Sequence, residues 1–294
     1  MTIDEWLTDV TEQFSRANIP TARLDAELIL CHMLGVERSW LIAHGADSLS
    51  RAALMNPKGV RPGGISVYGN RLVLRRLKRE PIAYLFGEKE FYGRDFIVTK
   101  DVLIPRPETE VLVELAKKYG LAGSIIDAGC GSGAIGLTLA KELPDSTVTL
   151  ADISEDALEV AQKNAKQLKI KDVRFIKSDL LEHWIEKDSS NPFDVIVANL
   201  PYVDKSWERS PETDHEPKLA LFAADGGLAL IKQLIDQSVE LLTQHGFLLL
   251  EADPEQHEAI IRYANQFREV DRLDYGLLLG KLSARIGSKF ECGG

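Results

Sequence analysis

The chain has 294 residues, 45% hydrophobic and 27% charged, which are proportions of a globular protein and exclude disordered, collagen-like and coiled-coil chains. It carries 35 basic and 45 acidic residues, a formal net charge of −10, and the acidity belongs to the part after residue 100. A protein that grips duplex DNA by its phosphates usually presents a basic face, so this charge argues against direct nucleic-acid binding. The length fits one large domain, or a large domain with a smaller companion.

The sequence gives no sign of membrane insertion, secretion or metal binding. Its longest apolar runs, such as residues 247–250, are far shorter than the roughly 18 residues that a membrane-spanning helix needs. Acidic residues stand at the N-terminus, where a signal peptide needs basic ones. Cys31 and His32 are the closest candidate ligands and have no partners at ligand spacing, so we expect them at buried helix positions. We therefore expect a soluble cytoplasmic protein without a metal, and a monomer.

The first 80 residues have helical patterning. Short amphipathic helices are predicted over residues 1–55, with Leu24, Leu28, Cys31 and Leu34 forming one apolar stripe before Gly35. A second helical stretch covers residues 70–79, whose basic cluster is interpreted as a solvated helix face. Residues 56–64 are rich in turn-forming residues and are expected to form a flexible loop.

After residue 81 the pattern changes to strands. Residues 91–98 resemble two short strands meeting at a turn, and a proline-stiffened segment leads into a helix at 108–118. Strands are then predicted at 124–128, 147–153, 173–178, 194–198 and 247–252, with helices at 134–141, after Ser154 and at 227–243, and a final hairpin at 268–285. Strands separated by helices predict a mainly parallel sheet covered on both faces, which binds ligands outside the carboxyl ends of its strands.

The loop at residues 127–136 follows the first of these strands and contains the alternating glycines Gly129, Gly131 and Gly133. Glycine allows a close backbone approach to a ligand and positive φ angles, and this loop also opens a helix N-terminus with free amides. Asp152 ends the next strand, where a carboxylate can accept hydrogen bonds from two ribose hydroxyls. Together they predict a nucleotide-type cofactor, whereas a tight turn that needs glycine for geometry alone is the alternative.

The choice of cofactor depends on further residues. The loop also satisfies the dinucleotide pattern G-x-G-x-x-G, with Asp152 near the expected spacing, so NAD is an alternative. Three features favour S-adenosylmethionine. Asp127 is placed to hold the amino-acid end of a methionine-like ligand, Asp179 ends the third strand beside the expected adenine amine, and the fourth strand ends in a polar tetrapeptide.

That tetrapeptide is Asn199-Leu200-Pro201-Tyr202. An amide nitrogen is a poor nucleophile, and two acceptors facing its N–H bonds would orient it and favour the charge that develops as a methyl group arrives. The Asn199 side-chain oxygen is one acceptor, and the Leu200 carbonyl is the other because Pro201 keeps Leu200 extended. Tyr202 offers a flat surface to a planar amide. An Asx-type turn after the strand is the structural alternative.

Two further stretches carry a resemblance to a known family. Residues 80–93 (EPIAYLFGEKEFYG) and 103–110 (LIPRPETE) closely match the linker hairpin and entry loop of the HemK-type protein-glutamine N5-methyltransferases, which modify the Gly-Gly-Gln glutamine of peptide-chain release factors. The resemblance covers most of residues 1–285. It implies a small helical N-terminal domain joined by a β-hairpin to a Rossmann-like, seven-stranded class I methyltransferase domain. The boundaries expected are 1–80 for a release-factor-binding domain, 81–107 for the hairpin linker and 108–294 for the methyltransferase domain.

The resemblance also assigns the site. The catalytic residues would be Asn199, Leu200, Pro201 and Tyr202. S-adenosylmethionine, converted to S-adenosylhomocysteine, would be bound by Asp127, Gly129, Cys130, Gly131, Ser132, Gly133, Asp152, Asp179, Leu180 and Asn199.

The sequence departs from the family at Leu200, which replaces the first proline of Asn-Pro-Pro-Tyr, and at Asp253, where glycine is usual. Residues 56–70 and the tail from 286 have no clear counterpart. Alternatives are an adenine N6-methyltransferase acting on nucleic acid, a glutamine methyltransferase acting on a ribosomal protein, a non-catalytic cofactor-binding scaffold and an NAD oxidoreductase.

Overall fold

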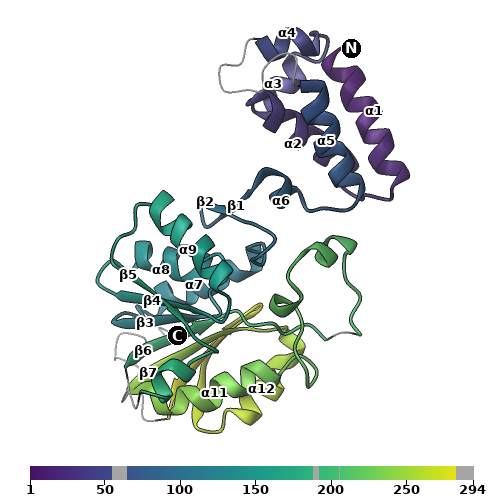
Figure 1. The fold of residues 1–294 in the computed structure, drawn as a ribbon. Coiled ribbons are helices and arrows are strands. Elements are labelled where there is room, and N and C mark those ends of the chain that lie inside the picture. Colours follow the sequence, from purple (N-terminus) through teal and green to yellow (C-terminus); the bar gives the residue numbers. More distant parts are fainter. Residues whose placement is uncertain (55–64, 188–191, 205, 283–294) are drawn as a thin grey trace, which may run out of the picture. The chain divides into compact units, whose positions relative to one another are not determined.

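The computed structural model describes residues 1–54, 65–187, 192–204 and 206–282 (Figure 1). They form two compact units. The helical unit comprises Met1–Gly87 together with the short segment Ser210–His215, and the sheet unit comprises Glu88–Arg209 and Glu216–Gly294. The loop expected at 56–64 lies outside the described residues, and so does the tail from 286. The predicted division into 1–80, 81–107 and 108–294 stays a prediction.

The helical unit is built around a single apolar core. Its helices are α1 (Ile3–Arg16), α2 (Ala22–Leu34), α3 (Arg38–Ala43), α4 (Leu49–Leu54), α5 (Ile65–Leu77) and α6 (Ile82–Phe86). A capping box starts α1, in which Thr2 and Glu5 satisfy each other's backbone N–H groups. Gly35 ends α2 in the left-handed conformation, as the sequence predicts. The core side chains include Trp6, Phe14, Leu30 and Met33.

Two details of the helical unit correct the sequence interpretation. The prediction that Leu24 lies on the apolar stripe of this helix is wrong, because Leu24 is 38% exposed. Helix α2 instead buries the face that contains Ile29, Leu30 and Met33. This helix is apolar on nearly all sides, so its sequence does not single out one face. The basic cluster at 71–79 is also not simply solvated, because Arg76 is only 4% exposed. Its guanidinium pairs with Asp25 at 2.7 Å.

The sheet unit contains a hairpin and a seven-stranded sheet. The hairpin pairs β1 (Glu88–Phe91) with β2 (Arg94–Ile97), so its first strand lies before the predicted 91–98. The sheet has the order β5-β4-β3-β6-β7-β9-β8. Its strands are β3 (Ser124–Ala128), β4 (Thr147–Asp152), β5 (Val173–Lys177), β6 (Phe193–Ala198), β7 (Leu242–Glu251), β8 (Phe267–Leu273) and β9 (Gly276–Lys281). Strand β9 runs antiparallel to both β7 and β8, and the strand pairs from β5 to β7 are parallel, which confirms the Rossmann-like, seven-stranded expectation.

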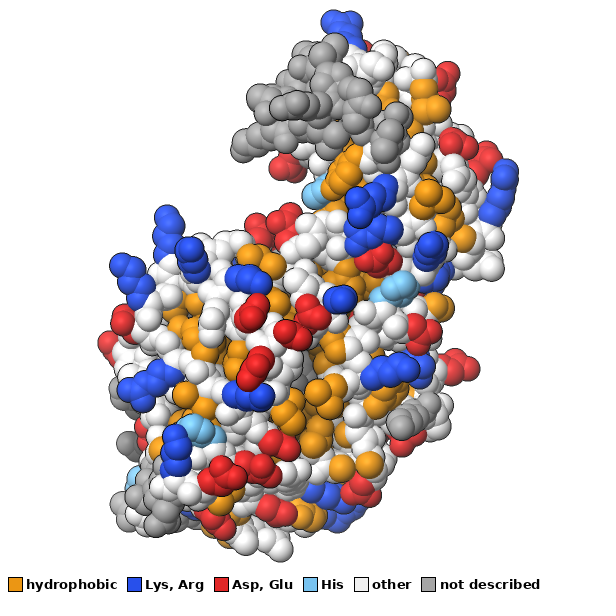
Figure 2. Space-filling model, viewed as in Figure 1, with side chains coloured by type: hydrophobic (Ala, Val, Ile, Leu, Met, Phe, Trp, Pro, Cys, Tyr) orange, Lys and Arg blue, Asp and Glu red, His pale blue; other side chains and the backbone are white. Residues whose placement is uncertain are grey.

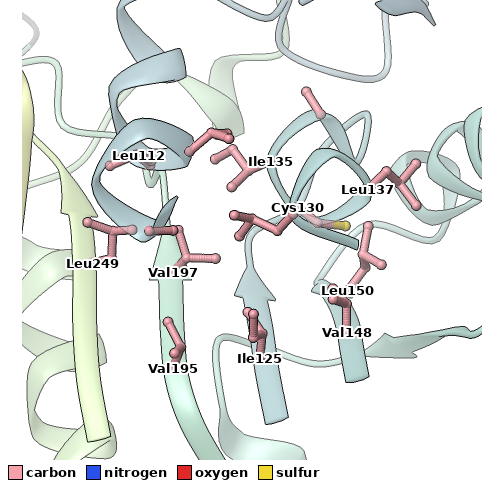
Figure 3. Close-up of a cluster of buried hydrophobic side chains, with 14 of the residues drawn as sticks. Leu112, Ile125, Cys130, Ile135, Leu137, Val148, Leu150, Val195, Val197 and Leu249 are labelled. Atoms are coloured by element: carbon pink, nitrogen blue, oxygen red, sulfur yellow. The ribbon is translucent and has the colours of Figure 1, made fainter. Parts of the chain in front are cut away.

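Helices cover both faces of this sheet (Figure 1). On one face lie α7 (Glu110–Lys118), α8 (Ala134–Glu142) and α9 (Glu155–Gln167); on the other lie α10 (Glu182–Ile185), α11 (Ala229–Leu241) and α12 (His257–Tyr263). Successive strand residues alternate between these faces. Ile125, Val197 and Leu249 pack under α7 and α8, as Figure 3 shows, whereas Ile126 and Ile196 pack toward α11. Burial on both faces explains why the strands are continuous apolar runs.

Short 3₁₀ turns complete the unit at Pro107–Thr109, Lys218–Ala220 and Pro254–Gln256. Helix α7 therefore begins at Glu110, two residues after the predicted start. Strand β7 begins at Leu242, five residues before the predicted one, so the preceding helix ends sooner. A further 3₁₀ segment, Pro211–His215, belongs to the helical unit.

Candidate active site

A cavity of about 310 Å³ opens at the carboxyl ends of β3, β4, β5 and β6, and every residue that lines it belongs to the sheet unit. Because parallel strands end at one edge of a sheet, loops far apart in the sequence meet there. Of the residues predicted from the sequence, the structure brings the following together around this cavity: Gly129, Cys130, Gly131, Ser132, Asp152, Asp179, Leu180, Asn199, Leu200 and Pro201. Asp127, Gly133 and Tyr202 do not line it.

The glycine loop turns sharply between β3 and α8. Gly129, Gly131 and Gly133 have φ angles of 74°, 52° and 80°, in the left-handed region that glycine adopts without strain. The Gly129 and Cys130 amides both donate to the Ala151 carbonyl of β4, at 2.8 and 2.9 Å, which ties the loop to the neighbouring strand. A Cβ on Gly129 would stand 2.9 Å from Leu200 Cδ2. The loop glycine therefore leaves room for the residue that replaces the usual proline.

Asp152 ends β4 at the edge of the cavity. One of its oxygens accepts from the Gly131 amide at 2.9 Å, and the other accepts from the Ser154 amide at 2.9 Å. Burial raises the pKa of Asp152, while its backbone hydrogen bonds lower it. Each carboxylate oxygen has two acceptor sites, so both oxygens retain capacity for a ligand hydroxyl. Asp179 and Leu180 line the cavity after β5.

Asp127 lies fully buried behind the glycine loop. Its Oδ2 accepts from the Gly136 amide at 2.8 Å, which links β3 to the first turn of α8. Burial raises the pKa of Asp127 to about 7. Its other oxygen, Oδ1, has no hydrogen-bond partner among the described residues. The geometry shows a carboxyl that holds strand and helix together, and direct contact of Asp127 with a cofactor stays a prediction.

Asn199 follows β6 and has a fixed orientation. Its Nδ2 donates to Thr109 Oγ1 at 3.1 Å, and no hydrogen bond to its Oδ1 comes from the part of the chain that the structure describes. Leu200 is buried against the glycine loop. The Tyr202 hydroxyl turns away from the cavity and donates to Glu251 Oε1 at 3.2 Å, and burial raises the Tyr202 pKa.

Thr109 and Glu251 are site residues that the sequence reasoning missed. Thr109 is buried at the end of the 3₁₀ turn before α7 and lines the cavity. Glu251 ends β7, which pairs with β6 so that Leu250 lies opposite Ala198, and its side chain is 2% exposed. A carboxylate directly after an apolar strand that neighbours the Asn199 strand was the available signal for Glu251.

A buried ion pair shapes the entry loop. Glu216 accepts from the Arg106 guanidinium and, at 3.2 Å, from the Ile104 amide. Arg106 and Pro217 both line the cavity. The proline-rich segment and the segment after the tetrapeptide are therefore joined at the mouth of the site.

On the face of the sheet unit visible in Figure 2, basic and acidic side chains are interspersed rather than gathered into a basic surface. Within the described residues, no group of His, Cys, Asp and Glu is arranged to hold a metal ion. In the same residues, no helix has the length and apolar character required to cross a bilayer.

Comparisons with known proteins identify the family. A "Methyltransferase domain" model matches residues 122–266, and a "PrmC N-terminal domain" model matches residues 5–56. A protein of Coxiella burnetii named release factor glutamine methyltransferase is 37% identical over 98% of this chain and 100% of its own length. The proteins of that name from Escherichia coli (37% identical, covering 88% of this chain and 89% of the relative) and Koribacter versatilis (36%, 90% and 92%) are similar. The chain belongs to the release factor glutamine methyltransferase family.

Membership in the release factor glutamine methyltransferase family confirms the resemblance to that family, and it makes the protein a methyltransferase. The match spans nearly the whole chain of these relatives, so both units have counterparts in them. A methyltransferase needs a methyl donor and an acceptor, and the cavity presents residues of two kinds, the glycine loop with its acids and the tetrapeptide after β6.

Proposed function

We propose that this protein transfers a methyl group from S-adenosylmethionine to the side-chain amide nitrogen (N5) of the glutamine in the Gly-Gly-Gln motif of peptide-chain release factors. One observation carries the proposal: the glycine loop after β3 and Asn199 after the paired strand β6 line the same cavity. The relatives that match nearly the whole chain are named for this activity.

The residues at the cavity fit the cofactor. A volume of about 310 Å³ lies in the range of small-molecule sites. Asp152 would hold the ribose hydroxyls, and Asp179 with Leu180 would lie beside the adenine. The backbone of residues 129–133 would pass close to the ligand, because its three glycines have no Cβ. The bound cofactor supplies a methyl group on a sulfonium, whose departure as a thioether needs no proton.

The residues after β6 fit the glutamine. Asn199 Oδ1 and the Leu200 carbonyl would accept hydrogen bonds from the two N–H groups of the glutamine side chain. Pro201 keeps the Leu200 carbonyl in place because the residue before a proline is held extended. The chain thereby orients the nitrogen lone pair along the methyl–sulfur bond, and orientation of this kind supplies much of the acceleration in transfer reactions. The methylated nitrogen then loses its extra proton to solvent.

A radiolabel assay tests the proposed function. The protein is incubated with methyl-tritiated S-adenosylmethionine and one of four acceptors: a release factor, its Gly-Gly-Gln variant with Gln replaced by Asn, ribosomal proteins, or unmethylated DNA. We expect label in the unaltered release factor alone, because asparagine is one methylene too short to reach the two acceptors.

Each other outcome contradicts the proposal. Label in DNA favours an adenine N6-methyltransferase, since the adenine amine presents the same pair of N–H bonds. Label in ribosomal proteins favours a glutamine methyltransferase that acts on a ribosomal protein. A protein that binds the cofactor but labels nothing is a scaffold.

A further inference from the structure

The side chain of Asn199 sits in a short polar network that extends away from the cavity. Its Nδ2 donates to Thr109 Oγ1 at 3.1 Å. Behind them lies Glu251, which accepts the Tyr202 hydroxyl at 3.2 Å and is 2% exposed. Burial raises the pKa of Glu251 above its ordinary value, and hydrogen bonds from the Thr109, Tyr202 and Asn199 side chains offset only part of that rise. A buried carboxyl group thus interacts with Asn199 from outside the set of residues that line the cavity.

The hydrogen bonds of this network fix which atom donates and which accepts at each step. Glu251 accepts from the Tyr202 hydroxyl at 3.2 Å, and where it accepts from the Thr109 hydroxyl as well it takes that group's single hydrogen. The oxygen of Thr109 is then left with its lone pairs, and it accepts from its other neighbour. An amide presents two hydrogens on one side and an oxygen on the other. Asn199 consequently has to turn its NH₂ toward Thr109 and Glu251 and its Oδ1 toward the cavity.

We infer that Glu251 and Thr109 are positioning residues, which set the polarity of the Asn199 amide so that its oxygen, and not its NH₂, faces the glutamine nitrogen. The inference rests on the proposed function, because only an N–H-bearing acceptor substrate needs an oxygen at this place. With the amide reversed, two NH₂ groups would face each other, and the charge developing on the substrate nitrogen would lose one of its two acceptors.

This role explains the restraint on Asn199 in a chain without the usual proline after it. A proline at position 200 would limit the backbone of Asn199, whereas Leu200 does not. The side chain is held instead by a hydrogen bond to Thr109, which is itself fixed by the 3₁₀ turn Pro107–Thr109.

A matched pair of variants at Thr109 tests the inference. Thr109→Val keeps the shape of the side chain and removes the hydroxyl, whereas Thr109→Ser keeps the hydroxyl and removes a methyl group. We expect Thr109→Val to lower kcat about tenfold or more, the rate equivalent of one hydrogen bond, and Thr109→Ser to recover most of that loss. A role in packing alone gives the reverse order, with the serine variant the more impaired, and would overturn the inference.

Glu251→Gln provides the second arm, because its NH₂ can donate to Thr109 and allow the whole network to reverse. We expect a similar loss of kcat, with the affinity for S-adenosylhomocysteine measured by calorimetry within about threefold of the unaltered protein. If this variant fails to bind S-adenosylhomocysteine because it does not fold, the kcat values of Thr109→Val and Thr109→Ser test the inference on their own. Wild-type kcat in both Thr109 variants overturns the inference but leaves the proposed function intact. Absence of release-factor methylation by the unaltered protein is failure of the proposed function.

Discussion

Asp127 is fully buried and does not line the cavity. It accepts one hydrogen bond, from Gly136 in the first turn of α8, and its second oxygen has no partner among the described residues. Burial without a cationic partner disfavours the charged form. The folded protein therefore keeps the Asp127 proton to about pH 7, whereas the unfolded chain releases it near pH 4.

This difference predicts a pH dependence of stability. Since the folded-state pKa is the higher one, the stability is full below about pH 4 and is lost as the pH rises toward 7. Asp127→Asn keeps an acceptor for Gly136 and removes the titration. We expect the free energy of unfolding of the unaltered sheet unit to fall by up to about 4 kcal/mol relative to the variant over this range. Urea titrations of both proteins from pH 4 to 7 measure it. A difference that does not change with pH would show that Asp127 is ionised throughout.

For single residues, the sequence predicts those that stand in a recognisable motif or spacing. It does not predict residues that act by holding another side chain in place. Sequence reasoning finds Gly129, Gly131, Asp152 and Asn199 because each stands at or after the end of a recognisable strand, and the structure puts them around one cavity. Thr109 is missed because its relation to Asn199 spans 90 positions of the chain. Glu251 was accessible in principle, but a carboxylate after a strand becomes informative only when the strand order makes β7 the neighbour of β6.

Helix α8 contains a glycine that its packing requires. Alanine normally stabilises a helix interior relative to glycine by up to about 1 kcal/mol. A Cβ at Gly136, however, would lie 2.9 Å from Asp127 Oδ2 and 3.1 Å from Leu150 Cγ, both in the buried layer between helix and sheet. The helix is therefore close to the sheet because this position has no side chain.

We expect Gly136→Ala to destabilise the protein by about 1–3 kcal/mol, the usual cost of overpacking. Lys141→Ala, at an exposed position of the same helix, is the control and should change the stability by less than about 0.5 kcal/mol. Chemical denaturation measures both. A stabilised Gly136→Ala protein would mean that the helix moves outward without cost.

The segment Ser210–His215 is held to the helical unit by a buried ion-pair cluster. Glu212 pairs with Arg76 at 2.8 Å and with Arg79 at 3.0 Å, and Arg76 also pairs with Asp25. Burial raises the pKa of Glu212, but hydrogen bonds from Ser210 and Arg76 outweigh it and bring the pKa to about 2. The pairing is complete above about pH 4.5 and is lost as the pH falls toward 2.

Removing the Glu212 charge takes away the carboxylate that pairs with Arg79 and leaves Arg76 with Asp25 alone. We therefore expect Glu212→Gln at neutral pH to speed amide hydrogen exchange in Ser210–His215 about tenfold or more. Glu208→Gln, at an exposed position two residues before the segment, should leave the exchange unchanged. Equal exchange in the two variants would show that the 3₁₀ turn holds this segment without Glu212.

At the scale of elements, periodicity predicts the existence of helices and strands better than their faces or ends. The seven strands of the sheet are each near a predicted segment because burial on both faces gives apolar runs bounded by polar residues. The face of α2 is not predictable from periodicity, since that helix is apolar on most sides. The early start of β7 at Leu242 follows from its pairing with Phe193, a contact with a distant part of the chain.

For the whole molecule, the division into two units predicts which amides a bound cofactor protects from exchange. All residues that line the cavity belong to the sheet unit. We expect saturating S-adenosylhomocysteine to slow amide exchange at residues 129–133, 152–154 and 178–180, and to leave α1, α2 and α5 of the helical unit unchanged. A ligand at 100 times its dissociation constant stabilises its binding state by about 2.7 kcal/mol, so the slowing is measurable by mass spectrometry. Protection of the α1 or α2 amides would place part of the cofactor site in the helical unit.

At the scale of the whole molecule, the chain has an excess of acidic residues, and basic and acidic side chains are mixed on the face in Figure 2.

The proposed mechanism depends most on Asn199 binding the glutamine side chain and not the cofactor. The most direct measurement is the single-turnover rate of methyl transfer to a release factor by Asn199→Ala, combined with its affinity for S-adenosylhomocysteine. Loss of one fixed group that stabilises developing charge costs about 100-fold or more in rate, so we predict that decrease with a cofactor affinity within a few fold of the unaltered protein. An unchanged rate, or a collapse of cofactor binding, would contradict the account.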